Sequence, residues 1–80
     1  MPEQALTNYQ LMNAVNLVAT MAVARIADIL NQPPTLALLD FMESETCDML
    51  YDTQTKFWCD GPEAVAMAYL LETNEQGAIN

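Results

Sequence analysis

Histidine is absent from this 80-residue sequence, which also contains only two basic residues, two glycines and two cysteines. Histidine is the commonest general base in enzymes, so its absence disfavours most hydrolase and transferase designs. Two cysteines are too few for an all-cysteine zinc site. We therefore expect no catalytic residue, no metal and no cofactor.

The two cysteines, Cys47 and Cys59, have acidic neighbours in the sequence, which raise a thiol pKa and disfavour a nucleophilic role. Residues 1–10 contain Glu3 and neither Lys nor Arg, unlike a secretory signal. We expect two free, buried thiols in a cytoplasmic protein, although the spacing of the cysteines also permits a disulfide.

The scarcity of basic residues leaves eleven carboxylates against Arg25 and Lys56, a formal net charge of −9. Nucleic-acid phosphates and anionic lipids repel such a chain, so neither is expected as a direct partner. A small-molecule substrate is not expected either, because so short a chain rarely builds a closed pocket. The charge instead favours a basic protein partner.

Residues 9–30 contain no glycine or proline and are mostly apolar, which predicts one long helix. Thr7 or Asn8 suits its N-cap, and the two prolines at 33 and 34 end it near Asn31. A transmembrane span is not expected, because polar and charged residues interrupt the run at Asn13, Asn16, Thr20, Arg25 and Asp28.

Three further helices are predicted. One begins at Pro34 and ends at Met42, with Ala37, Leu38, Phe41 and Met42 facing inward. Ser44 caps the next, Glu45–Tyr51, which packs through Cys47, Leu50 and Tyr51. Pro62 begins the last, which ends near Glu72. Residues 52–56 form a polar turn, followed at Phe57 and Trp58 by a short extended segment or a wide hairpin.

The predicted fold is therefore all-α: a single domain over residues 1–80, in which one long N-terminal helix is packed by three short helices. Residues 1–7 and 73–80 are expected to be frayed tails.

The long helix is apolar around more than half of its circumference, whereas a surface helix needs an apolar arc of only about 100°. The opposite stripe contains Asn13, Asn16, Thr20, Ala24, Ala27 and Asn31. A second copy of the chain is the simplest cover for one flank; alternatively the short helices enclose the helix within one subunit. The predicted dimer interface is Leu11, Ala14, Val15, Val18, Met21, Ala22, Arg25 and Ile29.

Acidic residues concentrate between positions 40 and 52, with no basic residue among them. The carboxylates predicted to form a partner strip are those of Asp40, Glu43, Asp48 and Asp52. This strip docks a basic protein, or imitates a row of DNA phosphates, or is simply the solvated face of two helices. Arg25 either stabilises the fold through an ion pair with Asp28, Asp40 or Glu43, or contacts a partner protein at the interface.

Aromatic and methionine residues complete the pattern. Tyr51, Phe57, Trp58 and Tyr69 are expected to cap the short helices as part of the core, and the six methionines suit an adaptable interaction surface.

One series of residues resembles a family of short bacterial helical proteins of unknown function. The series is Ser44, Thr46, Leu50, Asp52, Thr55, Trp58, Gly61, Pro62 and Tyr69, and the resemblance spans residues 10–72. It implies an all-helical fold, a bacterial cytoplasmic setting and no established activity, and some relatives look like partner proteins of regulatory or toxin-antitoxin-type loci. It implies no catalytic residue.

These observations predict a non-catalytic protein-protein interaction module, a homodimeric bacterial regulatory or adaptor component. The alternative is an acidic nucleic-acid mimic that binds and blocks a DNA-binding protein.

Overall fold

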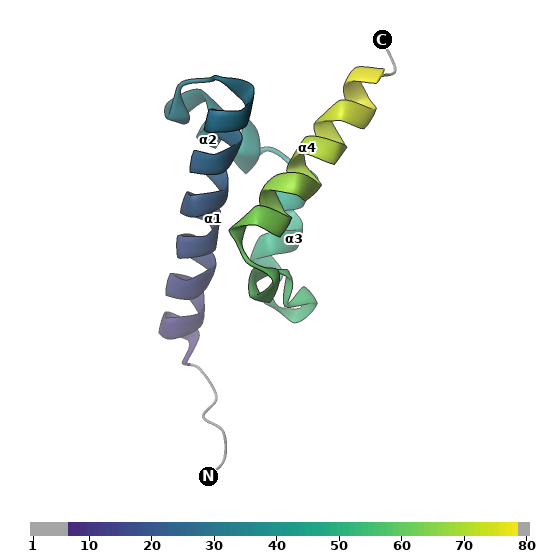
Figure 1. Cartoon of the computed structure of the whole chain (residues 1–80). Coiled ribbons are helices and arrows are strands. Elements are labelled where there is room, and N and C mark those ends of the chain that lie inside the picture. Colours follow the sequence, from purple (N-terminus) through teal and green to yellow (C-terminus); the bar gives the residue numbers. More distant parts are fainter. Residues whose placement is uncertain (1–6, 79–80) are drawn as a thin grey trace.

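The computed structural model describes residues 7–78, and the side chains of residues 7–74. Within this range the chain forms four α-helices and no strand, which confirms the predicted all-α fold with its long N-terminal helix (Figure 1). The elements in chain order are α1 (Asn8–Leu30), α2 (Pro34–Met42), α3 (Glu45–Tyr51), the 3-10 turns η1 (Thr53–Thr55) and η2 (Phe57–Asp60), and α4 (Pro62–Ala78).

A side-chain cap begins α1, and a residue in the left-handed conformation ends it. The Thr7 hydroxyl accepts a hydrogen bond from the Gln10 amide at 3.0 Å, and the Gln10 side chain accepts one from the Thr7 amide at 3.1 Å, which together form a capping box. Asn31 ends the helix in the left-handed conformation, with φ of 57°. The predicted bounds of α1 are therefore correct to one residue.

A serine joins the end of α2 to the start of α3. The Ser44 hydroxyl donates to the Phe41 carbonyl at 2.6 Å and accepts from the Cys47 amide at 3.1 Å. The predicted bounds of both helices are confirmed, because a proline at the first helical position and a serine cap are local signals.

The predicted inward face of α2 is half wrong. Ala37 and Phe41 are buried, but 43% of Leu38 and 60% of Met42 are exposed. Almost every position of this short helix is apolar, so its composition does not show which face meets α1.

The connection between α3 and α4 is not extended, contrary to the prediction for Phe57 and Trp58. These residues lie in η2, and Lys56, with φ of 55°, reverses the chain between η1 and η2. The Thr55 hydroxyl stabilises the reversal: it donates to the Met49 carbonyl at 3.0 Å and accepts from the Phe57 amide at 3.1 Å.

Helix α4 continues past its predicted end at Glu72 to Ala78. No proline follows Glu72, and one glycine costs a helix only about 1 kcal/mol, so nothing in the local sequence forces an end there. Residue 7 is the cap of α1 rather than part of a frayed tail. The remaining predicted tail residues, 1–6 and 79–80, lie outside the described residues.

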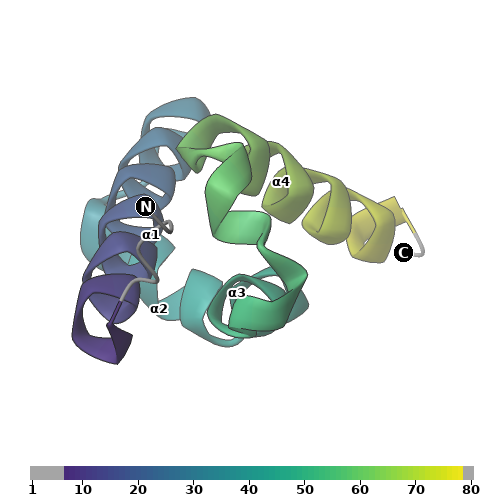
Figure 2. The ribbon, with the colours of Figure 1, turned by 90° about the horizontal axis from the view of Figure 1, so that it is seen from below.

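The core lies where α1, α2, α3 and the first half of α4 meet. Figures 1 and 2 both show that first half beside α1 and the C-terminal half leading away from it. At the centre the Phe41 and Tyr69 rings pack with centroids 5.7 Å apart. The buried apolar residues are Val15, Ala19, Ala22, Val23, Ile26, Ala27, Ala37, Phe41, Leu50, Val65, Ala66 and Tyr69.

Candidate interaction site

Two neighbouring hollows of about 430 and 300 Å³ lie along α1 and α2 and share Thr20 and Leu38. We call them together the α1–α2 groove. Its only charged lining residue is Asp48. The lining residues are Asn16, Ala19, Thr20, Val23, Ala24, Pro34, Thr35, Leu38, Phe41, Met42, Cys47, Asp48 and Tyr51.

Large apolar side chains border this groove on the surface of α1. Leu17 is 60% exposed and Met21 is 49% exposed. On a helix these two positions are neighbours of Thr20 and Ala24, which line the groove. The bordering ridge and the groove therefore form one apolar surface, in which the small residues of α1 lie between larger ones.

The predicted dimer interface on α1 is only partly exposed. Val15 and Ala22 are fully buried in the core, so their inclusion was wrong. Three predicted residues are half-buried, and three are exposed: Leu11, Ala14 and Val18 in the first group, Met21, Arg25 and Ile29 in the second.

The stripe predicted opposite the apolar face of α1 is exposed at five of its six positions: Asn13, Asn16, Thr20, Ala24 and Asn31. Ala27 belongs to the core, and the Asn16 side chain accepts a hydrogen bond from the Tyr51 hydroxyl at 2.6 Å. The exposed side of α1 is wider than the predicted stripe, because the neighbouring Leu17 and Met21 are exposed as well.

Arg25 links α1 to α4. Its Nε lies 3.1 Å from a Glu63 carboxylate oxygen, and its Nη1 lies 3.6 Å from an Asp28 oxygen. The pairing with Asp28 was predicted, whereas Glu63 was not, because 38 residues separate it from Arg25 and no local pattern connects them. The predicted alternatives, Asp40 and Glu43, make no ion pair with Arg25.

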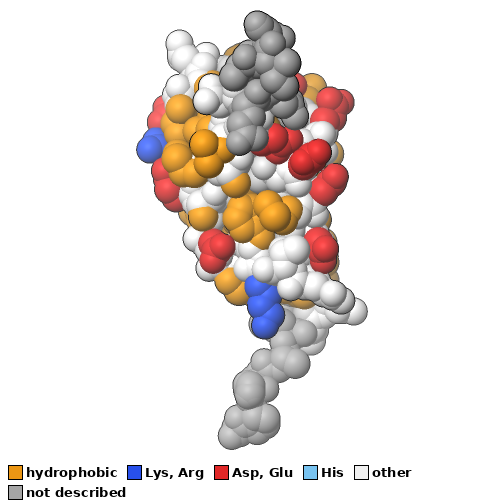
Figure 3. Space-filling view, turned by 90° about the vertical axis from the view of Figure 1, so that its right-hand side faces the viewer, with side chains coloured by type: hydrophobic (Ala, Val, Ile, Leu, Met, Phe, Trp, Pro, Cys, Tyr) orange, Lys and Arg blue, Asp and Glu red, His pale blue; other side chains and the backbone are white. Residues whose placement is uncertain are grey.

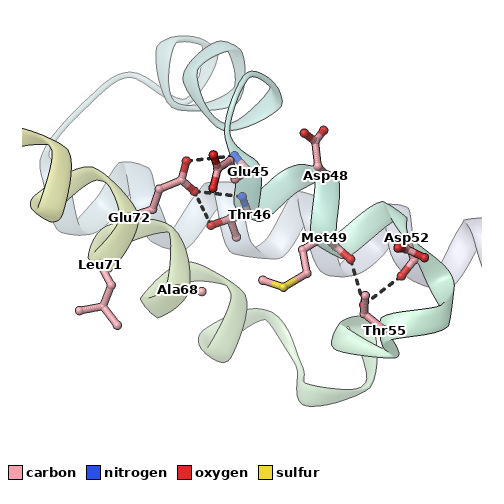
Figure 4. Close-up of a pocket in the computed structure, with 9 residues that line it drawn as sticks. All are labelled: Glu45, Thr46, Asp48, Met49, Asp52, Thr55, Ala68, Leu71 and Glu72. Atoms are coloured by element: carbon pink, nitrogen blue, oxygen red, sulfur yellow. Dashed lines mark hydrogen bonds between the residues drawn. The ribbon is translucent and has the colours of Figure 1, made fainter.

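A third hollow, of about 690 Å³, lies between α3 and α4, and we call it the α3–α4 groove. Figure 4 shows Met49 pointing from α3 toward Ala68 on α4, with Leu71 on the next turn. Carboxylates line the same groove at Glu45, Asp48, Asp52 and Glu72. On this side of the molecule Figure 3 shows apolar side chains between acidic ones.

The predicted acidic strip is divided between two places. Asp48 and Asp52 line the α3–α4 groove, whereas Asp40 and Glu43 do not. Asp40 is instead near Tyr69: burial raises the pKa of the Tyr69 hydroxyl, and the charges of Asp40 and Glu72 raise it further. All four predicted carboxylates are exposed.

Glu72, which the sequence reasoning did not single out, caps the N-terminus of α3 from another helix. Its carboxylate accepts hydrogen bonds from the amides of Glu45 and Thr46, each at 3.0 Å, and from the Thr46 hydroxyl at 2.7 Å (Figure 4). Burial raises the pKa of this carboxyl, but the three hydrogen bonds more than offset it, so the Glu72 pKa lies below its ordinary value.

Both cysteines are free thiols, as predicted, and they differ in environment. Burial, and then the charge of Asp48, raises the pKa of the half-buried Cys47 thiol. Cys59 is exposed, contrary to its expected burial. A raised pKa at Cys47 favours the neutral thiol, which is the weaker nucleophile.

The aromatic residues divide between the core and the surface. Phe57 and Trp58 are half-buried against the core and Tyr69 is inside it, which agrees with the predicted aromatic cap, whereas Tyr51 is more exposed.

Within the described part of the chain, no group of three or more His, Cys, Asp or Glu side chains has an arrangement that holds a metal ion. No family model, curated protein or solved structure matches the chain. The resemblance to a bacterial helical family therefore stays a prediction, and the function has to be argued from the surface itself.

Proposed function

We propose that this protein is a non-catalytic interaction module that forms a homodimer through the outer face of α1 and the adjoining α1–α2 groove. The observation that carries the proposal is the continuous apolar surface at Leu17, Met21, Leu38 and Met42, each of which is 43–60% exposed. A cluster of large apolar side chains open to water is typical of a protein contact.

A second copy of the chain suits this face because α1 carries little charge. Its only charged residues are Arg25 and Asp28, so pairing two α1 helices brings few of the carboxylates together despite the net charge of −9. A helix of 23 residues is about 34 Å long, which is enough for an isologous contact of ordinary size. Thr20 and Ala24 are small enough to let a partner helix approach closely.

The absence of histidine and the raised pKa of Cys47 support a non-catalytic role. The grooves are lined by carboxylates, amides, hydroxyls and apolar groups, and histidine, the commonest general base, is absent from the sequence. We place this acidic binding protein in the bacterial cytoplasm, as a regulator or adaptor of a toxin-antitoxin-type locus.

Helix α1 is also long and apolar enough to cross a membrane, by length and composition alone. The core helix of a soluble protein passes the same test, and α1 places six residues in the core that it shares with α2, α3 and α4. We therefore propose that the dimer forms in aqueous solution and not in a membrane. Fractionation of cells that express the protein from its own gene tests this. Recovery with the membrane after a carbonate wash would contradict it.

The alternative function, an acidic mimic that blocks a DNA-binding protein, is favoured by one observation. Asp40, Glu43, Asp48 and Asp52 are all exposed, and none forms an ion pair with Arg25 or Lys56 in the described structure. Replacing these four by their amides should abolish capture of such a partner, whereas a dimer through α1 should keep its affinity.

The homodimer is tested by light scattering after size-exclusion chromatography. Leu17→Glu combined with Met21→Glu places two carboxylates in the contact, so the variant should elute as a monomer under conditions in which the wild type is a dimer. Leu71→Glu is the matched control, because Leu71 is as exposed as Leu17, 62% against 60%, but lies on α4. If the control dissociates and the α1 variant does not, the dimer uses a different face.

A further inference from the structure

The α3–α4 groove combines two features that a single kind of partner satisfies. Its floor is apolar, with Met49 42% and Leu71 62% exposed on either side of Ala68. Carboxylates at Glu45, Asp48, Asp52 and Glu72 line it, and neither basic residue of the chain is among its lining residues. We propose that this groove docks a basic amphipathic helix from a partner protein.

The spacing along α3 sets the pattern of such a helix. Glu45 and Asp48 lie three residues apart on one face of α3, and Asp52, the C-cap of α3, lines the same groove four residues further along. A helix lying alongside α3 meets them with Lys or Arg at the same spacing of three and four residues. Its neighbouring apolar residues then cover Met49 and Leu71, and methionine adapts to side chains of different shape.

Charge excludes a second copy of this chain as the occupant. The chain has only Arg25 and Lys56 as cations, and Arg25 is already paired with Glu63 and Asp28. No segment of the sequence carries basic residues at helical spacing. The groove therefore fits a different, basic protein. Among the lining residues, Asp48 is shared with the α1–α2 groove proposed for the dimer, and the others differ.

A free polyamine meets only half of these requirements. It neutralises the carboxylates but leaves the apolar floor at Met49, Ala68 and Leu71 open to water. A helix that carries both basic and apolar residues satisfies the charges and the floor together.

The probe for this site is a fluorescein-labelled synthetic helix of about four turns, with Lys and Arg at the matching spacing and Leu on the adjoining face, measured by fluorescence anisotropy at physiological salt. Glu45→Gln with Asp52→Asn changes two carboxylates that line this groove and not the α1–α2 groove, and it should weaken binding roughly 3- to 10-fold. Asparagine keeps the side-chain acceptor with which Asp52 bonds the Gln54 amide, so the turn η1 stays intact. Leu71→Ser should weaken binding to a similar extent by removing part of the floor.

The matched control is Asp40→Asn with Glu43→Gln, which changes the net charge equally at residues that do not line the groove. It should leave binding within about twofold of the wild type. Equal weakening by both double variants would overturn the proposal, because the attraction would then be a general effect of charge. Equal affinity for spermidine and for the peptide, or no binding of the peptide, would overturn it as well.

The proposal rests on the view that the protein acts by contact, but its failure is distinguishable from failure of the dimer. Leu17→Glu with Met21→Glu should abolish the dimer and leave peptide binding unchanged. Glu45→Gln with Asp52→Asn, at residues outside the α1–α2 groove, should weaken peptide binding and leave the dimer unchanged. A peptide that binds only the dimer, and not the α1 variant, would contradict the assignment of its site to α3 and α4.

Discussion

Glu72 on α4 and Thr46 at the start of α3 are joined by two hydrogen bonds, from the Thr46 amide at 3.0 Å and from its hydroxyl at 2.7 Å to one carboxylate oxygen. The other oxygen of the same carboxylate accepts from the Glu45 amide at 3.0 Å. A carboxylate from a distant helix thus satisfies two of the free amides at the N-terminus of α3 and opposes the positive end of its dipole. This contact fixes the two helices that form the α3–α4 groove.

Glu72→Ala should destabilise the protein more than any other single loss of an acidic side chain. Three hydrogen bonds to a half-buried charge disappear, so we expect a loss of about 1 to 2 kcal/mol and a fall in Tm of roughly 5 to 10 °C. Thermal unfolding followed by circular dichroism measures this. Glu43→Ala is the control, because among the described residues the Glu43 side chain accepts none of the hydrogen bonds of the kind that Glu72 accepts. Equal falls in Tm would show that Glu72 does not hold α3.

The stability difference between the wild type and Glu72→Gln should depend on pH. The Glu72 pKa is lowered in the folded state, so its carboxylate stabilises the fold above the ordinary pKa of 4.5, and this stabilisation is lost as the pH falls through the lower, folded pKa. The difference should therefore be constant at neutral pH and shrink below about pH 4.5. Urea titrations of both proteins measure it, and a difference that grows in acid would contradict the assigned pKa direction.

Arg25→Ala should have a small effect on stability. The Arg25 side chain is 47% exposed and its partner Glu63 is 60% exposed, so water screens the pair. We expect a loss below about 1 kcal/mol, and a fall in Tm of no more than roughly 5 °C that becomes smaller at high salt. A salt-independent loss above about 2 kcal/mol would show that Arg25 supports the packing of α1 on α4.

The two thiols should differ in reactivity. The Cys47 thiol is half-buried with a raised pKa, whereas Cys59 is exposed, so iodoacetamide should alkylate Cys59 faster. The single-thiol variants Cys47→Ser and Cys59→Ser allow the alkylation rate of each thiol to be measured by mass spectrometry. Unfolding both variants in urea should remove most of the difference between the two rates. Faster alkylation of Cys47 in the native protein would contradict its placement.

Local signals account for what the sequence predicted well. Thr7, Pro34, Ser44 and Pro62 mark the first residues or caps of the four helices, and each acts through its own backbone or a neighbour within three residues. Which face of each helix is buried was harder to predict, because α1 is apolar around more than half of its circumference and α2 is apolar at most of its positions. Leu38 and Met42 were therefore placed inward, and Val15 and Ala22 outward, in error.

The features of the α3–α4 groove depend on contacts between distant residues. Glu72 reaches Thr46 across 26 positions, and nothing near either residue in the sequence indicates the pairing. The predicted strip of carboxylates followed sequence order, so it grouped Asp40 and Glu43 with Asp48 and Asp52, whereas the fold groups the last two with Glu45 and Glu72. Only the packing of α3 on α4 brings these side chains together with Leu71 and Met49.

In the proposed homodimer, a second subunit covers the apolar outer face of α1. Sedimentation velocity of the wild-type protein at micromolar concentration and physiological salt tests it most directly. We expect a species of twice the chain mass that dissociates on dilution. This species should be absent when Leu17 and Met21 are both replaced by Glu. A single species of monomer mass at every concentration, unchanged by those substitutions, would contradict it.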